Sequence, residues 1–230
     1  FHRMLIDGIE VEYRRPDGTI KGDLVHLIDF KNPEKNDWLA VNQFTIIENH
    51  NNRRPDIVVF VNGIPLVVIE LKNPADEKAT IDSAFRQIQT YKQQIPGLFT
   101  YNEMIVISDG LDAKIGTLTS IRERFMPWRT IEGEHLAPET MLRLEVMVRG
   151  VFEKRRFLDL IRNYLVFEID HDGTVAKKMA GYHQYHAVKN ALESSVWASG
   201  PRGDKRGGVV WHTQGSGKSL TMVFFTGEIV

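Results

Sequence analysis

Two apolar runs on either side of an Asn-Gly pair constrain this chain most, in the stretch RRPDIVVFVNGIPLVVIELKNP at positions 53–74. Asn-Gly favours the type I′ turn between antiparallel strands, so we expect a β-hairpin of residues 57–61 and 66–71. A hairpin that only has to fold needs no charge at its buried ends, because buried charge costs free energy unless it is paired. Asp56 and Glu70 nevertheless stand at the two adjoining strand ends.

These charges fit a metal-dependent hydrolytic site. Asp56 opens one strand and Glu70 ends its partner, so their carboxylates can converge, and two carboxylates with water suit Mg²⁺. Glu70 and Lys72 are two positions apart and therefore share a strand face, where Lys72 can orient the attacking water and offset phosphate charge. We predict that all three residues are catalytic and that the two carboxylates bind metal. The alternative is an edge hairpin with charges at frayed ends.

The period of the sequence changes to that of a helix over 75–96, where apolar residues recur every three or four positions. Asp76 and Glu77 favour a helix N-terminus. Gln87 and Tyr91 are four positions apart and share one face of this helix, so both can support the hairpin site. The alternative is that Tyr91 belongs to the core and Gln87 to the solvated surface.

A phosphate-binding loop is predicted near the other end of the sequence, where HTQGSGKS occupies positions 212–219. Glycines let backbone amides approach phosphates, the lysine reaches the β- and γ-phosphates, and the final serine ligates Mg²⁺. His212 stands where the full motif begins with glycine, although helicase-type motors often lack that glycine. The predicted nucleotide-binding residues of the loop are Gly215, Ser216, Gly217, Lys218 and Ser219.

Gln184 lies upstream in a Tyr- and His-rich segment, GYHQYHAV, and is a candidate for reading the adenine base. A solvated helix residue is the alternative. His183 and His186 are three positions apart and are more simply explained as helix-surface residues than as metal ligands.

The remaining segments complete an α/β pattern. We expect a hairpin over 9–30 with a Pro-Asp-Gly turn and a polar loop over 48–55. Further strands are expected over 38–47, 103–110 and 208–211. Expected helices cover two segments within 137–165 that break near Gly150, residues 181–197, and a segment that begins near residue 217.

Composition narrows the class of protein. With 42% hydrophobic and 26% charged residues the chain is expected to build a packed core, and 29 basic against 30 acidic residues do not announce a nucleic-acid binder. The absence of cysteine excludes disulfides and thiolate metal sites and suits the cytoplasm. No apolar run is long enough to span a bilayer, so no membrane role is expected. Because Phe1 is not an initiator methionine, we expect a piece of a longer protein.

The order of these motifs closely resembles the restriction (R) subunit of type I restriction-modification enzymes. The resemblance rests on P-D…E-L-K, then Q-x-x-x-Y, a companion motif of one nuclease subgroup, then RFLDLIRNY, YHQYHAV and HTQGSGKSLTM. It covers nearly the whole chain from about Ile9. It implies a PD-(D/E)xK nuclease-like mixed sheet flanked by helices, followed by the beginning of a RecA-like parallel α/β motor domain of superfamily 2.

The resemblance also implies function. Residues 1–165 are expected to be an endonuclease domain with a helical linker, and residues 166–230 the start of the first motor domain. Implied cofactors are Mg²⁺ and, in the full-length protein, ATP that drives DNA translocation. Implied partners are double-stranded DNA and the modification (methyltransferase) and specificity subunits. The sequence departs from the family in lacking additional N-terminal residues and in ending 11 residues after Ser219.

Two other functions stay open at this point. One is a nuclease–helicase fusion that acts in DNA repair. The other is a catalytically silent DNA-binding or docking module with a nuclease-like fold, which loss of any one of the three charged hairpin residues would have favoured.

Overall fold

The computed structural model describes residues 1–73, 75, 80–133 and 135–229, and it divides into two compact units, Phe1–Leu118 and Thr119–Val230. The boundary between the compact units therefore comes before residue 165, the boundary that the sequence motifs predict between the endonuclease and the motor domain. The division of labour at residue 165 stays a prediction. Each unit is described below by itself.

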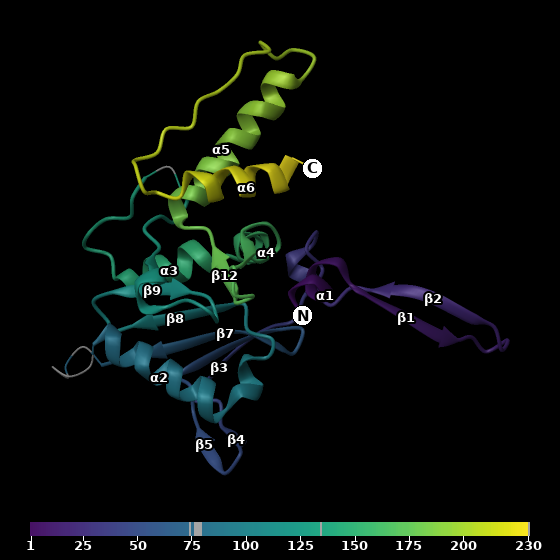
Figure 1. Cartoon of the computed structure of the whole chain (residues 1–230), viewed down its shortest axis with the longest axis vertical. Coiled ribbons are helices and arrows are strands. Elements are labelled where there is room, and N and C mark those ends of the chain that lie inside the picture. Colours follow the sequence, from purple (N-terminus) through teal and green to yellow (C-terminus); the bar gives the residue numbers. More distant parts are fainter. Residues whose placement is uncertain (74, 76–79, 134, 230) are drawn as a thin grey trace. The chain divides into compact units, whose positions relative to one another are not determined.

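The first unit is built on a mixed sheet, with its strands in the order β9-β8-β7-β6-β3 (Figure 1). β6 pairs antiparallel with both β3 and β7, β7 pairs parallel with β8, and β8 pairs antiparallel with β9. The strands are β3 (Trp38–Asn42), β6 (Ile57–Val61), β7 (Ile64–Leu71), β8 (Met104–Ser108) and β9 (Ala113–Gly116). The predicted mixed sheet is confirmed.

The Asn-Gly turn of the β6–β7 hairpin has the predicted geometry. Asn62 has φ 51° and Gly63 has φ 78°, the positive values that a type I′ turn requires at both central positions. The Asn62 side chain also accepts a hydrogen bond from the Asp37 backbone N–H at 2.7 Å. The turn therefore fixes the register of β7 against β6.

Helix α2 (Ile81–Gln94) supplies the crossover that parallel pairing of β7 with β8 requires. It begins after Thr80, whose side chain accepts from the Ser83 N–H, and it packs its buried residues against β7 and β8. The continuous apolar sequence of β8 reflects burial of all its side chains. Asp76 and Glu77, the predicted helix N-terminus, lie outside the described residues.

Two further hairpins belong to the first unit. The predicted hairpin over 9–30 is confirmed as β1 (Ile9–Arg14) and β2 (Ile20–Val25). The prediction of one strand over 38–47 and a polar loop over 48–55 is wrong, because the chain turns at Gln43 (φ 51°) and forms a second strand pair. That pair is β4 (Ile46–Glu48) and β5 (Asn51–Arg53).

The described part of the second unit contains helices and an antiparallel strand pair. The predicted helices are confirmed, although the first runs through Gly150 and the break falls at positions 152–153. The elements are α3 (Arg143–Val151), α4 (Lys154–Asn163), β11 (Leu165–Ile169), β12 (Val175–Met179), α5 (Tyr182–Ser199) and α6 (Lys218–Ile229). Short elements of both units are α1 (His2–Asp7), η1 (Pro33–Lys35), η2 (Pro96–Phe99), η3 (Arg122–Arg124) and β10 (Met126–Pro127).

The strand predicted over 208–211 is not formed. Val209 is 90% exposed and Trp211 88% exposed, so their apolar surface gains no burial there. A parallel strand is stabilised by neighbours on both sides and by cover on both faces, and no described strand pairs with these residues. The RecA-like sheet therefore stays a prediction. Among the helices that the structure describes, none has the length and apolar character needed to cross a membrane.

Candidate active site

The β6–β7 hairpin places two carboxylates opposite each other. Ile57 pairs with Ile69, so the next position of each strand brings Asp56 across from Glu70. Asp56 is fixed by two hydrogen bonds, because its Oδ2 accepts from the Leu71 N–H and its Oδ1 from Gln43 Nε2, both at 2.8 Å. The strand pairing predicted from the sequence therefore brings the acids together.

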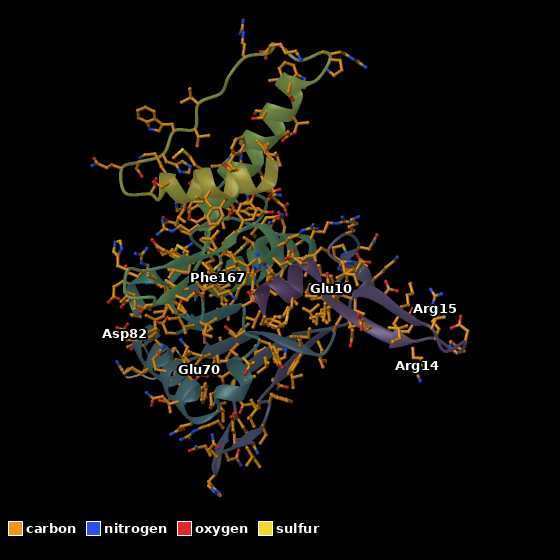
Figure 2. The ribbon with its side chains drawn as sticks, turned by 45° about the vertical axis from the view of Figure 1, so that its right-hand side comes forward. Glu10, Arg14, Arg15, Glu70, Asp82 and Phe167 are labelled. Carbon is orange, nitrogen blue, oxygen red and sulfur yellow. The ribbon has the colours of Figure 1, made fainter. Side chains whose placement is uncertain are left out.

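Glu70 is almost completely buried, with 3% of its surface exposed. Its Oε1 accepts a hydrogen bond from Lys72 Nζ at 2.7 Å, while Oε2 is buried and has no hydrogen-bond partner among the described residues. Burial raises the pKa of Glu70, the nearby charge of Asp56 raises it further, and Lys72 acts in the opposite direction. Figure 2 shows Glu70 within the body of the first unit.

Helix α2 adds the two polar residues of the Q-x-x-x-Y pattern. Tyr91 is buried and its hydroxyl donates to the Arg54 carbonyl oxygen at 3.3 Å. Burial raises the pKa of Tyr91, and so do the charges of Glu70 and Asp56, whereas a hydrogen bond with the Gln87 side chain lowers it. Tyr91 therefore lies near the carboxylate pair with Gln87 next to it, and Tyr91 also belongs to the core.

The donor set can be tested against Mg²⁺. Among the described residues no group of three or more His, Cys, Asp or Glu side chains gathers to hold a metal, so the hairpin offers two carboxylates. Mg²⁺ binds through one or two carboxylates and keeps several waters, which matches this set. The buried Oε2 of Glu70 accepts no hydrogen bond from the part of the chain that the structure describes, so its lone pairs could bind a cation. The residues fit the ion.

The sequence pattern missed one residue that orders this site. Gln43 follows β3 and reaches Asp56 with its side-chain amide, and the Gln43 N–H also donates to the Asp56 carbonyl oxygen at 2.9 Å. Its left-handed backbone turns the chain at that point. The short motif spans only the hairpin, so a glutamine 13 positions before Asp56 carries no local signal.

The predicted phosphate loop lies between 208–211 and α6 in the second unit. Gly215 and Gly217 have φ values of 80° and 79°, which glycine adopts without strain. Lys218 is the first residue of α6, and its Nζ donates to the carbonyl oxygens of His212 and Thr213. Ser219 follows in the first turn and is exposed, and Ser216 Oγ donates to the Thr213 carbonyl at 2.8 Å.

Gln184 is brought to this loop by α5. Its Oε1 accepts from the Gly181 N–H at 2.9 Å, and its Nε2 donates to the Gly217 carbonyl at 3.0 Å. Only 4% of its surface is exposed, so it is not a solvated helix residue. Next to it, His183 Nε2 lies 3.1 Å from the Ser216 carbonyl oxygen. The structure thus joins Gln184 to the loop, with both ends of its amide engaged.

Comparison with known proteins gives two matches to family models. Residues 1–124 match the N terminus of the type I restriction enzyme R protein, and residues 183–230 match the SWI2/SNF2 ATPase. The first match covers the carboxylate hairpin and α2, and the second covers Gln184 and the phosphate loop.

Individual relatives are similar over most of the chain. The type I restriction enzyme HindI endonuclease subunit of Haemophilus influenzae is 42% identical over 233 residues, which cover 100% of this chain and 22% of that protein. Two proteins of Methanocaldococcus jannaschii, the putative MjaIXP and MjaVIIIP endonuclease subunits, are 35% and 32% identical over 98% and 87% of this chain. The matched regions are 23% and 19% of those proteins, so the chain spans about a fifth of its relatives' length.

Proposed function

The chain belongs to the family of type I restriction enzyme R proteins, and on that premise we propose that it carries the Mg²⁺-dependent DNA endonuclease centre of such an enzyme. The observation that carries the proposal is the buried, half-paired Glu70 carboxylate across from Asp56, with the Lys72 ammonium at 2.7 Å. Phosphodiester hydrolysis needs these two kinds of group next to each other: anionic oxygens to hold a cation and a cation to face the phosphate.

Each residue of the site has a different proposed role. Asp56 and the Oε2 of Glu70 would hold Mg²⁺, which would supply Lewis-acid polarisation of the scissile phosphate and a more acidic attacking water. Lys72 holds Glu70 in place and presents protons of its ammonium group to the water or to the phosphate charge. Gln43 and the Leu71 N–H keep Asp56 oriented.

Tyr91 and Gln87 support the site from α2. The Tyr91 hydroxyl donates to the Arg54 carbonyl oxygen, two positions before Asp56, which fixes the helix relative to the hairpin. We therefore assign Tyr91 and Gln87 to positioning of the carboxylates. Removal of either side chain should loosen Glu70 without removing a ligand.

The second part of the proposal concerns the motor of the complete subunit. The SWI2/SNF2 match over residues 183–230 supports ATP-driven translocation on double-stranded DNA, with Mg²⁺ and ATP bound through Lys218, Ser219 and the glycine loop. The names of the relatives, endonuclease subunits of type I restriction enzymes, support assembly into a restriction complex, and we propose that its other subunits are the modification and specificity subunits. Base recognition then belongs to those partners.

A nicking assay with the assembled restriction complex tests the endonuclease. Lys72→Ala should lower Mg²⁺-dependent cleavage of plasmid DNA by about 100-fold or more, because it removes a proton donor and phosphate contact from the reacting centre. DNA-stimulated ATP hydrolysis should be retained. The matched control is Lys21→Ala, because Lys21 also bonds a carboxylate two positions away on a strand, Asp23 at 2.9 Å. Cleavage at the native rate by the Lys72→Ala complex would reject the endonuclease assignment and favour a silent module.

A further inference from the structure

The β4–β5 hairpin is an exposed arm that leads directly into the carboxylate site, with only Arg54 and Pro55 between β5 and Asp56. In Figure 1 this hairpin projects from the first unit with its turn pointing away from the sheet. We propose that its turn and the following arginine bind the phosphate backbone of the duplex DNA that is cut at Glu70 and Asp56. The proposal rests on the endonuclease function and adds a binding surface to it.

The side chains of the arm suit a phosphate group, because they donate hydrogen bonds and include no carboxylate. Residues 49–54 read Asn-His-Asn-Asn-Arg-Arg, so every side chain can donate a hydrogen bond and none is a carboxylate. Asn49, His50, Asn52 and Arg54 are exposed. The nearest acid is Glu48, and its two oxygens already accept from the Gly97 N–H at 3.0 and 3.3 Å. The exposed end of the arm is therefore uniformly donor-rich.

The composition of the arm is poor for folding. Asparagine is disfavoured in strands, and a pair of three-residue strands is at best marginally stable by itself. The turn places Asn49 and His50 in left-handed backbone, at φ 48° and 63°, which these two residue types adopt more readily than most others. In the strand that follows, stability alone would favour β-branched or aromatic residues over Asn51 and Asn52. In protein–DNA complexes, phosphate oxygens accept hydrogen bonds from Arg, Asn and other side chains with N–H groups, and the arm is made of such residues.

Specific contacts nevertheless hold the arm against α2. Arg53 Nε donates to Gln94 Oε1 at 2.5 Å, and Asn51 Nδ2 donates to the Gln94 carbonyl oxygen at 3.4 Å. The Tyr91 hydroxyl donates to the carbonyl oxygen of Arg54. The charge of Glu70 raises the pKa of Tyr91, so the helix that holds the arm also lies near the carboxylate. A surface that is held in place before DNA arrives loses less conformational entropy on binding.

The chain contains its own control for this arm. The tetrapeptide Arg-Arg-Pro-Asp occurs at 53–56 and again at 14–17, where it runs from the end of β1 into the turn of the β1–β2 hairpin. There Asp17 accepts hydrogen bonds from the N–H and hydroxyl of Thr19. Figure 2 shows Arg14 and Arg15 well apart from Glu70 within the first unit. Arg15 and Arg54 are both exposed arginines before proline, so they differ mainly in distance from the carboxylates.

Photo-crosslinking tests the contact without reference to cleavage. Benzoylphenylalanine is placed at His50 or, as the control, at Arg15 of the complete subunit, in the restriction complex that translocates on duplex DNA with ATP. Glu70→Gln is included so that the DNA stays intact. We expect a DNA crosslink from position 50 at least about tenfold above that from position 15. Equal yields at the two positions would overturn the proposal.

A charge reversal gives a second measurement. Arg54→Glu should lower plasmid cleavage by about tenfold in ~0.1 M salt, because it replaces a phosphate contact by repulsion, and lower salt should not restore the native rate. Arg15→Glu should cleave at the native rate, and ATP hydrolysis should be unchanged in both. Native cleavage by Arg54→Glu overturns the arm proposal and leaves the endonuclease standing. Failure of the endonuclease itself is a different result, namely native cleavage by Lys72→Ala.

Discussion

The ammonium of Lys72 donates to Oε1 of Glu70 over 2.7 Å, and no residue that the structure describes forms a hydrogen bond with the buried Oε2 of the same carboxylate. Burial and Asp56 favour the protonated carboxyl, whereas the ion pair with Lys72 favours the ionised form that a cation needs. The first two effects prevail, so the pKa of Glu70 is raised. An ionised Glu70 therefore destabilises the fold when no cation is bound, and a bound cation offsets this cost.

The first prediction follows from that balance. A carboxyl whose pKa is raised on folding stabilises the fold below its unfolded pKa near 4.5, and this stabilisation is lost as pH rises through the folded pKa. At pH 7.5 without metal, Glu70→Gln should therefore raise the Tm of the chain. Mg²⁺ should raise the Tm of the native chain and leave the Tm of Glu70→Gln unchanged. Thermal unfolding with and without MgCl₂ measures both effects.

The control for this prediction is Glu12→Gln, because Glu12 is exposed on β1 and takes no part in the site. It should leave both the Tm and its response to Mg²⁺ as in the native chain. A lower Tm for metal-free Glu70→Gln would mean that the ion pair with Lys72 outweighs burial.

Separate functions for the two halves are the second prediction. Glu70→Ala should abolish DNA cleavage by the complete subunit in its complex, because it removes a proposed metal ligand. ATP-driven translocation should stay nearly native, because the phosphate loop with Lys218 belongs to the other compact unit. Cleavage and translocation are measured on the same preparation, with its thermal stability checked. Loss of both activities in a variant of native stability would contradict the division of labour.

Local patterns in the sequence were sufficient to predict most of the strands and the long helix of the first unit. The Asn-Gly pair and the alternation around it give the β6–β7 hairpin, and the change of period gives α2, because both depend on neighbouring residues. The same two elements carry Asp56, Glu70 and Tyr91. The motif residues therefore come together as the sequence indicated, although their catalytic roles stay predictions.

What escaped prediction depends on contacts between distant segments. β4 and β5 were missed because their Asn-rich sequence lacks strand propensity, and their position is set by Gln94 and Gly97, which lie more than 40 positions away. The hydrogen bond from Gln43 to Asp56 was missed because the two residues are 13 positions apart and the short motif does not include Gln43. The strand expected over 208–211 has the right composition, but composition does not supply the neighbouring strands that such a strand needs.

The third prediction concerns Lys92, a half-buried lysine of α2 whose Nζ donates to the Leu118 carbonyl oxygen at 2.6 Å. Burial lowers the pKa of Lys92 from 10.5 to about 8. Between these two pH values the unfolded chain binds more protons than the folded chain, so the free energy of unfolding should rise with pH. After discounting for partial exposure, Lys92 should add about 1–2 kcal/mol to this rise.

Urea unfolding at pH 7.5 and pH 10 measures this effect against Lys92→Met, which cannot titrate. The gain in stability between the two pH values should be smaller in Lys92→Met by the amount stated above. Other lysines titrate equally in both proteins and cancel in the difference. The same pH dependence in both proteins would show that Lys92 keeps its ordinary pKa.

The fourth prediction concerns three helices of the second unit that meet at one ammonium group. Lys189 of α5 lies 2.7 Å from Asp159 Oδ2 of α4 and 2.7 Å from Glu228 Oε1 of α6. Lys189→Met leaves two mostly buried carboxylates facing each other, so it should cost about 2 kcal/mol of stability. Arg149→Met is the control, because Arg149 forms an exposed pair with Glu145 that is worth about 0.5 kcal/mol. Equal costs in denaturant unfolding would show that the cluster is solvated.

The last prediction concerns ATP. A phosphate loop binds nucleotide because a strand and the following helix hold its amides toward the phosphates. Here α6 follows the loop, but residues 208–211 form no strand, and the Lys218 ammonium is occupied by the carbonyl oxygens of His212 and Thr213. A nucleotide has to displace those contacts and order the segment before it. We therefore expect weak or no ATP binding by this 230-residue chain and negligible hydrolysis.

The complete subunit should bind ATP through the same loop, because a motor domain that supplies strand neighbours to 208–211 orders the amides. Isothermal titration of both proteins measures the difference, and Lys218→Ala in the complete subunit should remove the binding that appears there. Gln184→Ala should weaken it, since Gln184 holds the Gly217 carbonyl oxygen at 3.0 Å. Tight ATP binding by the 230-residue chain would show that Gln184 and α6 suffice to order the loop without a preceding strand.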